Sequence, residues 1–235
     1  VDGDNPYATL PKLNIFTYQL SRALQLKAAE AQSEGTEFAF DLGEFFRVVT
    51  VGGQNRFAHE EHVMQFVDNL SDPNFQYPYS DISKLDDVRH SLWFLPGVKQ
   101  CVALKELLKA HPYFSRFNVI VAAGSGDEDR LTNSALKEVR MAIGGHGGTL
   151  HPLETKTITL TCGQLTTGVT VPAWTAVLML NNIKSPSLYM QTAFRTQNPY
   201  EIATSGGEVR VKTDSFVFDF APDRILQTVA ELAQN

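Results

Sequence analysis

Residues 174–180 read Trp-Thr-Ala-Val-Leu-Met-Leu, a run that is apolar at every position except Thr175. A strand with apolar side chains at both alternating positions is typical of a parallel sheet whose two faces are both covered by helices. The sequence therefore predicts that this segment is a strand buried on both faces. A chain built around such a strand needs helices between its strands, so we expect an α/β architecture.

From Ser91 onward, short apolar runs alternate with stretches of helical periodicity. Threonine alternates with apolar residues over 157–162, so we expect that strand to be exposed on one side. Ser185 followed by Pro186 is a typical N-cap and N1 pair. This alternation predicts an open, doubly wound, mainly parallel α/β sheet. The expected strands are 92–95, 118–123, 157–162, 174–180 and 216–220, and the expected helices are 98–108, 129–143, one from 185 and one from 222.

The first 90 residues follow a different pattern and are expected to form a mostly helical arm. Helical spacing within residues 12–32 is shown by Leu13, Phe16, Leu20 and Leu24. A second amphipathic helix is expected from about Ala58 to Leu70, and residues 71–83, which hold two prolines, are expected to be a long connection. We therefore predict two regions, the arm at 1–90 and an α/β domain at 91–235.

Composition narrows the possible classes of function. Cys101 and Cys162 are the two cysteines, too few for a disulfide scaffold or a four-cysteine zinc site, so a reducing cytoplasm is the expected location. The longest apolar stretch, 171–180, is about half of what spans a bilayer, so no membrane contact is expected. With a formal net charge of −6, any nucleic-acid contact must come from a local patch. Because the chain begins with Val1 rather than Met, we expect it to be a fragment of a longer protein.

Residues 156–200 hold no Asp or Glu, although the whole chain has 26 acids. Eight threonines lie between Thr155 and Thr175, and hydroxyl groups beside backbone N–H groups suit the oxygens of a phosphate. The alternative interpretation is a threonine-rich strand at a neutral sheet edge, which the β-propensity of threonine alone would produce. Composition leaves both interpretations open.

Gln191 and Arg195 lie four residues apart on the expected helix and should share one face. An arginine presented from a rigid helix suits the γ-phosphate of a nucleotide, because its guanidinium stabilises charge on the transferring group without giving up a proton. The alternative is a surface arginine beside a polar neighbour. The surrounding motifs favour the first interpretation.

Two ordered motifs flank the apolar strand. Residues 165–172 read Leu-Thr-Thr-Gly-Val-Thr-Val-Pro, and residues 189–195 read Tyr-Met-Gln-Thr-Ala-Phe-Arg. They resemble motifs V and VI of superfamily 2 helicases, in which a Thr-Gly-hydrophobic-Asp-hydrophobic-Pro loop and a strand precede a helix with Gln-x-x-x-Arg. The resemblance covers about residues 91–223 and implies a second RecA-like, C-terminal helicase domain. Within the superfamily, the chain looks most like the helicase or translocase subunits of restriction enzymes.

The resemblance implies roles for particular residues. Arg195 matches the first motif VI arginine, a candidate arginine finger, and Gln191 matches the glutamine of that motif, so these two are the candidate catalytic residues. Gly168 matches the motif V glycine that approaches the nucleotide, and Thr170 stands where that motif usually has Asp. The positions that would contact the DNA backbone are Thr161, Gly124 and Ser125.

The chain also departs from the family pattern. Thr170 replaces the carboxylate that would bind the ribose, and Asn198 replaces the second motif VI arginine, so a finger role falls on Arg195 alone. The sequence has no Gly-x-x-x-x-Gly-Lys-Ser/Thr loop and no Asp-Glu-x-His magnesium motif. ATP and Mg²⁺ are therefore expected to bind mainly to an N-terminal RecA-like ATPase domain of the parent protein, and the isolated chain is expected to be inactive.

The function implied is that of the C-terminal motor domain of an ATP-dependent DNA helicase or translocase, part of a restriction endonuclease. Its expected partners are DNA, the N-terminal ATPase domain and a nuclease or methyltransferase domain of the same parent.

A different hypothesis is a self-contained Rossmann-like domain that binds a nucleotide cofactor at Gly124-Ser-Gly126. Position 129 is Asp where the dinucleotide fingerprint has its third glycine, which disfavours this hypothesis. His59-Glu-Glu-His62 does not match the helical zinc motif, because the second histidine comes one residue too early. No metal site is predicted, and Cys101 is expected to be an inert thiol on an apolar helix face.

Overall fold

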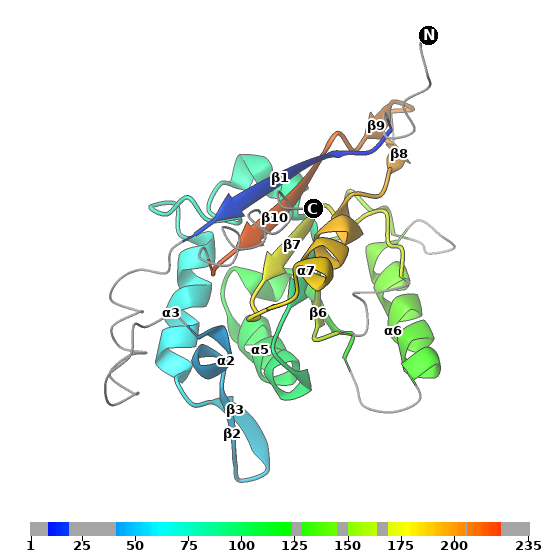
Figure 1. Ribbon diagram of the computed structural model, residues 1–235. Helices are drawn as coiled ribbons and strands as arrows, with labels where there is room; N and C mark the ends of the chain where they lie inside the picture. The colour runs from blue at the N-terminus through cyan, green and yellow to red at the C-terminus, as the bar shows by residue number, and fades with distance from the viewer. Residues whose placement is uncertain are drawn as a thin grey trace.

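The computed structural model describes residues 9–18, 41–123, 128–144, 150–163, 169–204 and 206–221. A six-stranded sheet, parallel throughout, runs through this part of the chain in the order β1-β10-β7-β4-β6-β5 (Figure 1). The prediction of a parallel α/β sheet is therefore confirmed. Its strands are β1 (Lys12–Thr17), β4 (His90–Phe94), β5 (Asn118–Val121), β6 (Thr157–Thr161), β7 (Ala176–Met179) and β10 (Asp214–Asp219).

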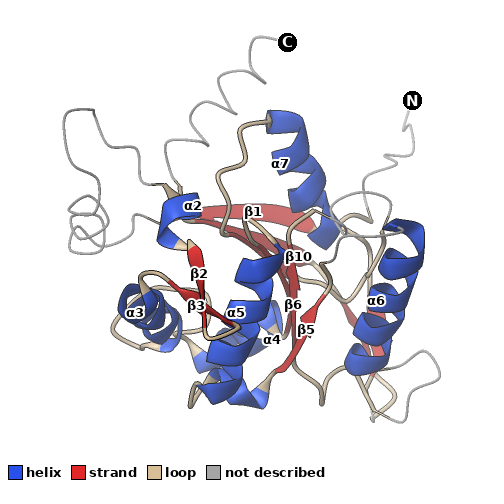
Figure 2. Ribbon diagram, turned by 90° about the horizontal axis from the view of Figure 1, so that it is seen from below, coloured by secondary structure: helices blue, strands red, loops and turns tan. Residues whose placement is uncertain are grey.

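Helices cover both faces of this sheet (Figure 2). One apolar cluster joins the sheet to α3 and α5, and a second cluster on the opposite face joins it to α6 and α7. Ser185 caps α7 by accepting a hydrogen bond from the Leu188 N–H, as its sequence predicts. The helices are α2 (Leu42–Phe45), α3 (Glu60–Ser71), α4 (Leu85–Val88), α5 (Val98–Ala110), α6 (Glu128–Ile143) and α7 (Pro186–Ala193), with 3₁₀ turns at η1 (Ile82–Lys84), η2 (Phe114–Arg116) and η3 (Phe194–Thr196).

Strand β7 is buried on both faces, as predicted. Ala176 and Leu178 pack in the α3/α5 cluster, whereas Val177 and Met179 pack in the α6/α7 cluster. The order of the strands explains this burial, because β7 lies between β10 and β4 in the interior of the sheet.

The prediction that the 157–162 strand is exposed on one side is wrong. All five residues of β6 are buried, including its threonines. β6 lies between β4 and β5 rather than at an edge, so helices cover both of its faces. The Thr161 hydroxyl donates to the Ala122 carbonyl at 3.0 Å, which satisfies a polar group that burial would otherwise leave without a partner.

The described part of the N-terminal region is not mostly helical, which corrects the arm prediction. Residues 12–17, expected to begin a helix, form edge strand β1, in which Phe16 stands opposite Phe218 of β10 and their rings stack 5.7 Å apart. The spacing of Leu13 and Phe16 was misleading because such a pattern reflects only residues close in the sequence. β1 is stabilised by a partner strand about 200 residues away. The rest of that expected helix, residues 19–40, lies outside the described residues, as does the helix expected from Pro222.

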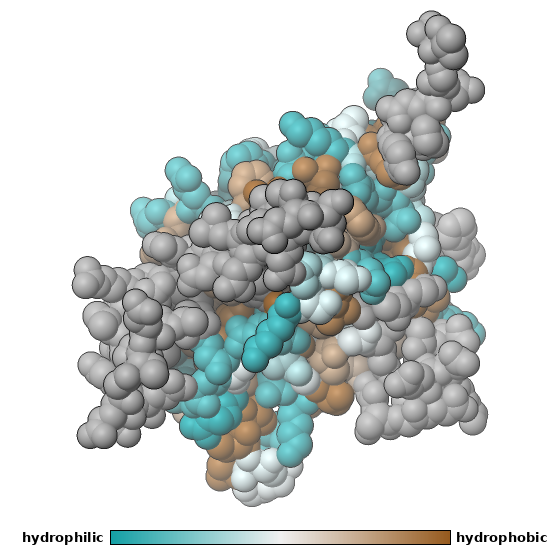
Figure 3. All heavy atoms as spheres, viewed as in Figure 1, coloured by the Kyte–Doolittle hydropathy of each residue, from teal (hydrophilic) through white to brown (hydrophobic). Residues whose placement is uncertain are grey.

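Two antiparallel hairpins lie outside the main sheet. β2 (Val48–Val51) and β3 (Gln54–Phe57) meet at Gly52-Gly53, whose φ angles of 58° and 80° suit glycine in a tight turn. Figure 3 shows an apolar patch at the tip of this hairpin, where Val51 is exposed. The second hairpin pairs β8 (Glu201–Ala203) with β9 (Val209–Val211). No helix in the described part of the chain is long and apolar enough to span a bilayer.

His90 begins β4 and is 4% exposed. Its Nε2 lies 2.8 Å from the Pro152 carbonyl and its Nδ1 3.0 Å from the Thr157 hydroxyl. A neutral ring that donates from Nε2 and accepts at Nδ1 satisfies both partners. Burial lowers the pKa of His90 to about 4, so the ring is neutral at pH 7.

His90 is expected to make the fold sensitive to acid. Its pKa in the folded state lies below the ordinary value near 6.5, so the unfolded chain binds more protons between these values and stability falls as pH drops. We expect the free energy of unfolding, measured in urea, to fall by about 3 kcal/mol between pH 6.5 and 4 because of this residue. His90→Gln should show a correspondingly shallower loss, and an unchanged pH slope in that variant would contradict this assignment.

Candidate functional site

The segment 169–174 lies between α6 and α7 on one face of the sheet. Its apolar side chains are buried in one cluster with residues from both helices. The segment contributes Val169, Val171, Ala173 and Trp174, α6 contributes Val139, and α7 contributes Tyr189 and Ala193. The segment forms no strand or helix. Its position brings the end of the predicted motif V beside the predicted motif VI.

Arg195 lies in η3, two residues beyond the end of α7, and is half-buried. Its Nη1 donates to the main-chain carbonyl of Val169, 26 residues earlier in the chain. Burial lowers the pKa of the Arg195 guanidinium, but an arginine starts so high that it stays cationic at neutral pH. Arg195 and Thr170 are therefore neighbours in space, joined through the residue that precedes Thr170.

Gln191 is exposed on the last full turn of α7. Its Nε2 donates to the Ser187 hydroxyl at 3.3 Å. α7 ends at Ala193, and the chain continues directly into η3, which carries Arg195. The other predicted residues are not placed at an accessible site. Thr161 is buried, and Gly124, Ser125 and Gly168 lie outside the described residues.

Two further cations contact the same segment, and sequence reasoning missed both. Arg140, in the last turn of α6, donates from Nη2 to the Thr170 carbonyl at 3.2 Å. Lys212, between β9 and β10, donates from Nζ to the carbonyls of Pro172 at 2.6 Å and Trp174 at 3.1 Å. Neither residue belongs to a motif, so no spacing in the sequence points to them.

Lys212 is in an unusual electrostatic environment. Burial lowers its pKa to about 7. A neutral amine retains two N–H donors, which is enough for both carbonyls, so this contact does not depend on the charge. The cation of Arg140, in contrast, is exposed.

A cavity of about 590 Å³ opens beside Thr170, a volume within the usual range for small-molecule sites. Arg140, Thr170 and the acidic Glu201 contribute its polar lining, and Pro172 and Tyr200 contribute apolar surface. The arginine, the hydroxyl and the aromatic ring can together contact a polar, planar group, whereas the Glu201 carboxylate disfavours an anion on its side of the cavity. This cavity is therefore the part of the candidate site that the described residues define best.

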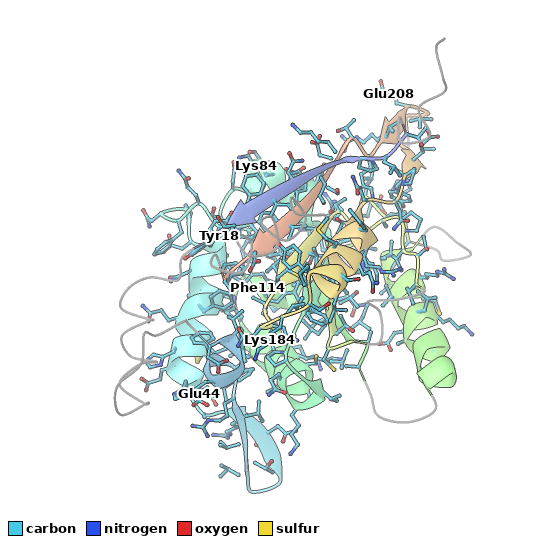
Figure 4. All side chains as sticks on the ribbon, viewed as in Figure 1. Tyr18, Glu44, Lys84, Phe114, Lys184 and Glu208 are labelled. Carbon is cyan, nitrogen blue, oxygen red and sulfur yellow. The ribbon has the colours of Figure 1, made fainter. Side chains whose placement is uncertain are left out.

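The other two basic residues of the acid-free stretch 156–200 do not line this cavity. Lys156 directly precedes β6, and Lys184 follows the end of β7. Since the two strands are parallel, these lysines lie at opposite edges of the sheet; Figure 4 shows Lys184 near the start of α7. The three positive charges of residues 156–200 therefore do not form one patch.

No group of three or more His, Cys, Asp or Glu side chains in the described ranges is placed to hold a metal ion. His59, which begins the His-Glu-Glu-His sequence, instead lies with its Nε2 3.1 Å from the Glu44 carboxylate, labelled in Figure 4.

The two cysteines interact at the carboxyl end of the sheet. Cys101 is buried in the first turn of α5, and Cys162 directly follows β6. A hydrogen bond from the Cys101 thiol lowers the pKa of Cys162 to about 7, while the same contact, together with burial, raises the pKa of Cys101. The expectation of an inert Cys101 fits this environment, whereas Cys162 gains thiolate character that the sequence did not indicate.

Cys162 should therefore be the reactive thiol. The midpoint of its alkylation rate by iodoacetamide is expected near pH 7, measured by mass spectrometry of its peptide. Cys101→Ala removes the donor and should move this midpoint toward the ordinary value of about 8.5. Equal midpoints in the wild type and the variant would show that Cys101 does not stabilise the thiolate.

Comparison with known proteins adds an independent observation. No protein-family model matches the chain. Over 245 residues it is 27% identical to a Mycoplasma pneumoniae protein whose name describes a type II restriction enzyme and methyltransferase, RM.MpnORF110P C-terminus. The match covers 97% of this chain and 32% of that protein. This chain is related to that restriction and modification protein.

The chain thus spans about a third of the length of its relative. Among solved structures, the C-terminal part of the Fun30 ATPase domain matches 75% of this chain and 55% of that chain, with 14% identity and a TM-score of 0.37. A likeness this distant adds nothing to the fold assignment, which rests on the parallel sheet described above.

Proposed function

We propose that this chain is the second RecA-like motor domain of an ATP-dependent DNA helicase or translocase that belongs to a restriction enzyme. In this proposal an N-terminal ATPase domain of the same parent binds most of the ATP and its Mg²⁺. The present domain closes on that nucleotide, and Arg195 contacts the γ-phosphate. DNA is the second partner, and the residues that the motif resemblance assigns to its backbone are Gly124 and Ser125, because Thr161 is buried.

The observation that carries the proposal is the contact between Arg195 and the Val169 carbonyl. The motif resemblance requires the arginine after α7 and the Thr-Gly-Val-Thr loop to lie together, although local sequence contacts do not enforce this. The relation to a protein named as a restriction enzyme and methyltransferase supports the same assignment. A guanidinium beside a nucleotide-binding loop can stabilise charge on a transferring phosphoryl group.

Gln191 has a supporting role in this proposal. It is exposed and bound only weakly, at 3.3 Å, to Ser187, so its amide can turn toward a phosphate or an attacking water when the two domains close. Thr170 offers a hydroxyl to the nucleotide in place of the usual carboxylate.

The test is DNA-stimulated ATP hydrolysis by the complete parent protein. Arg195→Ala is expected to lower kcat by about a hundredfold or more, because arginine fingers contribute about 10³ to 10⁵ in rate. Arg116→Ala is the matched control, since Arg116 is an exposed arginine on the opposite face of the sheet that lies over the Tyr113 ring. Circular dichroism and urea unfolding of each variant establish that the fold is intact.

Unchanged turnover in Arg195→Ala would remove the finger role. A parent protein with no DNA-stimulated ATPase activity would refute the motor assignment. Tight binding of a nucleotide cofactor to the chain itself would then favour the alternative, a Rossmann-like cofactor domain at Gly124-Ser-Gly126.

A further inference from the structure

Four main-chain carbonyls in the segment 169–174 accept hydrogen bonds from three cationic side chains. Arg195 binds the carbonyl of Val169, Arg140 binds that of Thr170, and Lys212 binds those of Pro172 and Trp174. The three donors come from separate elements, namely η3, the last turn of α6, and the link between β9 and β10.

These contacts supply the hydrogen-bond donors that the main-chain carbonyls of the segment require. Its apolar side chains are buried between α6 and α7, so its backbone is held close to the core without the hydrogen bonds of a strand or helix. The carbonyls of Val169, Pro172 and Trp174 are bonded in part-buried surroundings, whereas the bond between Arg140 and the Thr170 carbonyl lies at the surface. Buried carbonyls without a donor are costly, and long cationic side chains can reach them from a distance. The absence of acids from residues 156–200 leaves these cations no carboxylate within the segment to pair with instead.

The proposed function requires Arg195 to move onto a phosphate, and this movement would release the Val169 carbonyl. Arg140 and Lys212 hold the next carbonyls along the chain and do not depend on Arg195. They can therefore keep the segment in place while Arg195 exchanges one oxygen partner for another.

We propose that Arg140 and Lys212 are positioning residues that hold the segment 169–174 so that Thr170 and Arg195 meet the nucleotide in a fixed geometry. This inference rests on the proposed function. Neither residue needs to touch the nucleotide, because each acts through a main-chain carbonyl of the segment.

The experiment compares Arg140→Met and Lys212→Met in the complete parent protein. Methionine keeps much of the apolar stem of each side chain and removes its donors. Lys109→Met is the matched control, because Lys109 is also a last-turn cation, on α5, and its partner is Glu106 at 3.2 Å. Two readouts are measured, namely hydrogen–deuterium exchange of peptides that cover 169–175, and kcat and KM for ATP in DNA-stimulated hydrolysis.

The amides of Trp174 and Thr175 report on the segment, since they donate to the carbonyls of Val171 at 3.1 Å and His90 at 3.0 Å. Their exchange is expected to become about fivefold faster in Arg140→Met and in Lys212→Met, and to stay at the wild-type rate in Lys109→Met. We expect kcat to fall about five- to tenfold while KM for ATP changes less than twofold, because loss of geometry affects the transition state more than ground-state binding. Arg140→Lys keeps a donor and should restore most of kcat.

Wild-type exchange in both methionine variants would overturn the inference. Faster exchange with unchanged kcat would also overturn it, because the contacts would then serve only the fold. If Lys212→Met fails to fold, the exchange rates and kcat of Arg140→Met, whose substitution is on the exposed side of the segment, still test the inference. If the parent protein has no DNA-stimulated ATPase activity, the proposed function is refuted, and so is the catalytic role of Arg140 and Lys212. The exchange rates separately establish whether their contacts with the carbonyls hold the segment.

Discussion

Burial of the central strands on both faces is the constraint that orders the rest of this structure. β4 and β7 are adjacent and parallel, and every residue of both is buried. Apolar side chains that alternate above and below these strands require a layer of helices on each face, which α3 and α5 supply on one side and α6 and α7 on the other. Each connection must therefore cross a face, and the crossing before β7 is the segment 169–174.

That crossing couples the fold to the candidate chemistry. The apolar side chains of the segment are buried although its backbone has no regular structure, and three basic side chains supply hydrogen-bond donors to its carbonyls. Arg195 lies in the stretch 156–200, which is free of acids, whereas Arg140 and Lys212 reach the segment from outside that stretch. The contacts that the backbone of this segment receives also hold Arg195 beside the Val169 carbonyl.

Local patterns were sufficient to predict β4, β5, β7 and β10, the helices α3, α5, α6 and α7, and the Ser185 cap, because each depends on neighbours in the sequence. β1 was predicted wrongly because its stability comes from pairing with β10 at the other end of the chain. The burial of β6 depends on strand order, which periodicity does not encode. At the site, motif spacing indicated Arg195 and Thr170. Arg140, Lys212 and the Cys101–Cys162 pair act through contacts that only the folded chain creates.

Because β1 is an early segment of the chain and β10 a late one, the sheet is completed only when both ends of the described chain are present. A protein fragment that starts at Ser91 would retain both motifs and most strands but would lose β1. The hydrogen-bonding edge of β10 would then face solvent, with the ring of Phe218 stripped of its Phe16 neighbour. An unpaired apolar edge of this kind recruits strands from other molecules. Residues 12–17 thus cover the side of β10 and move the open edge of the sheet to β1, so they belong to the smallest piece of this protein that keeps the described sheet complete.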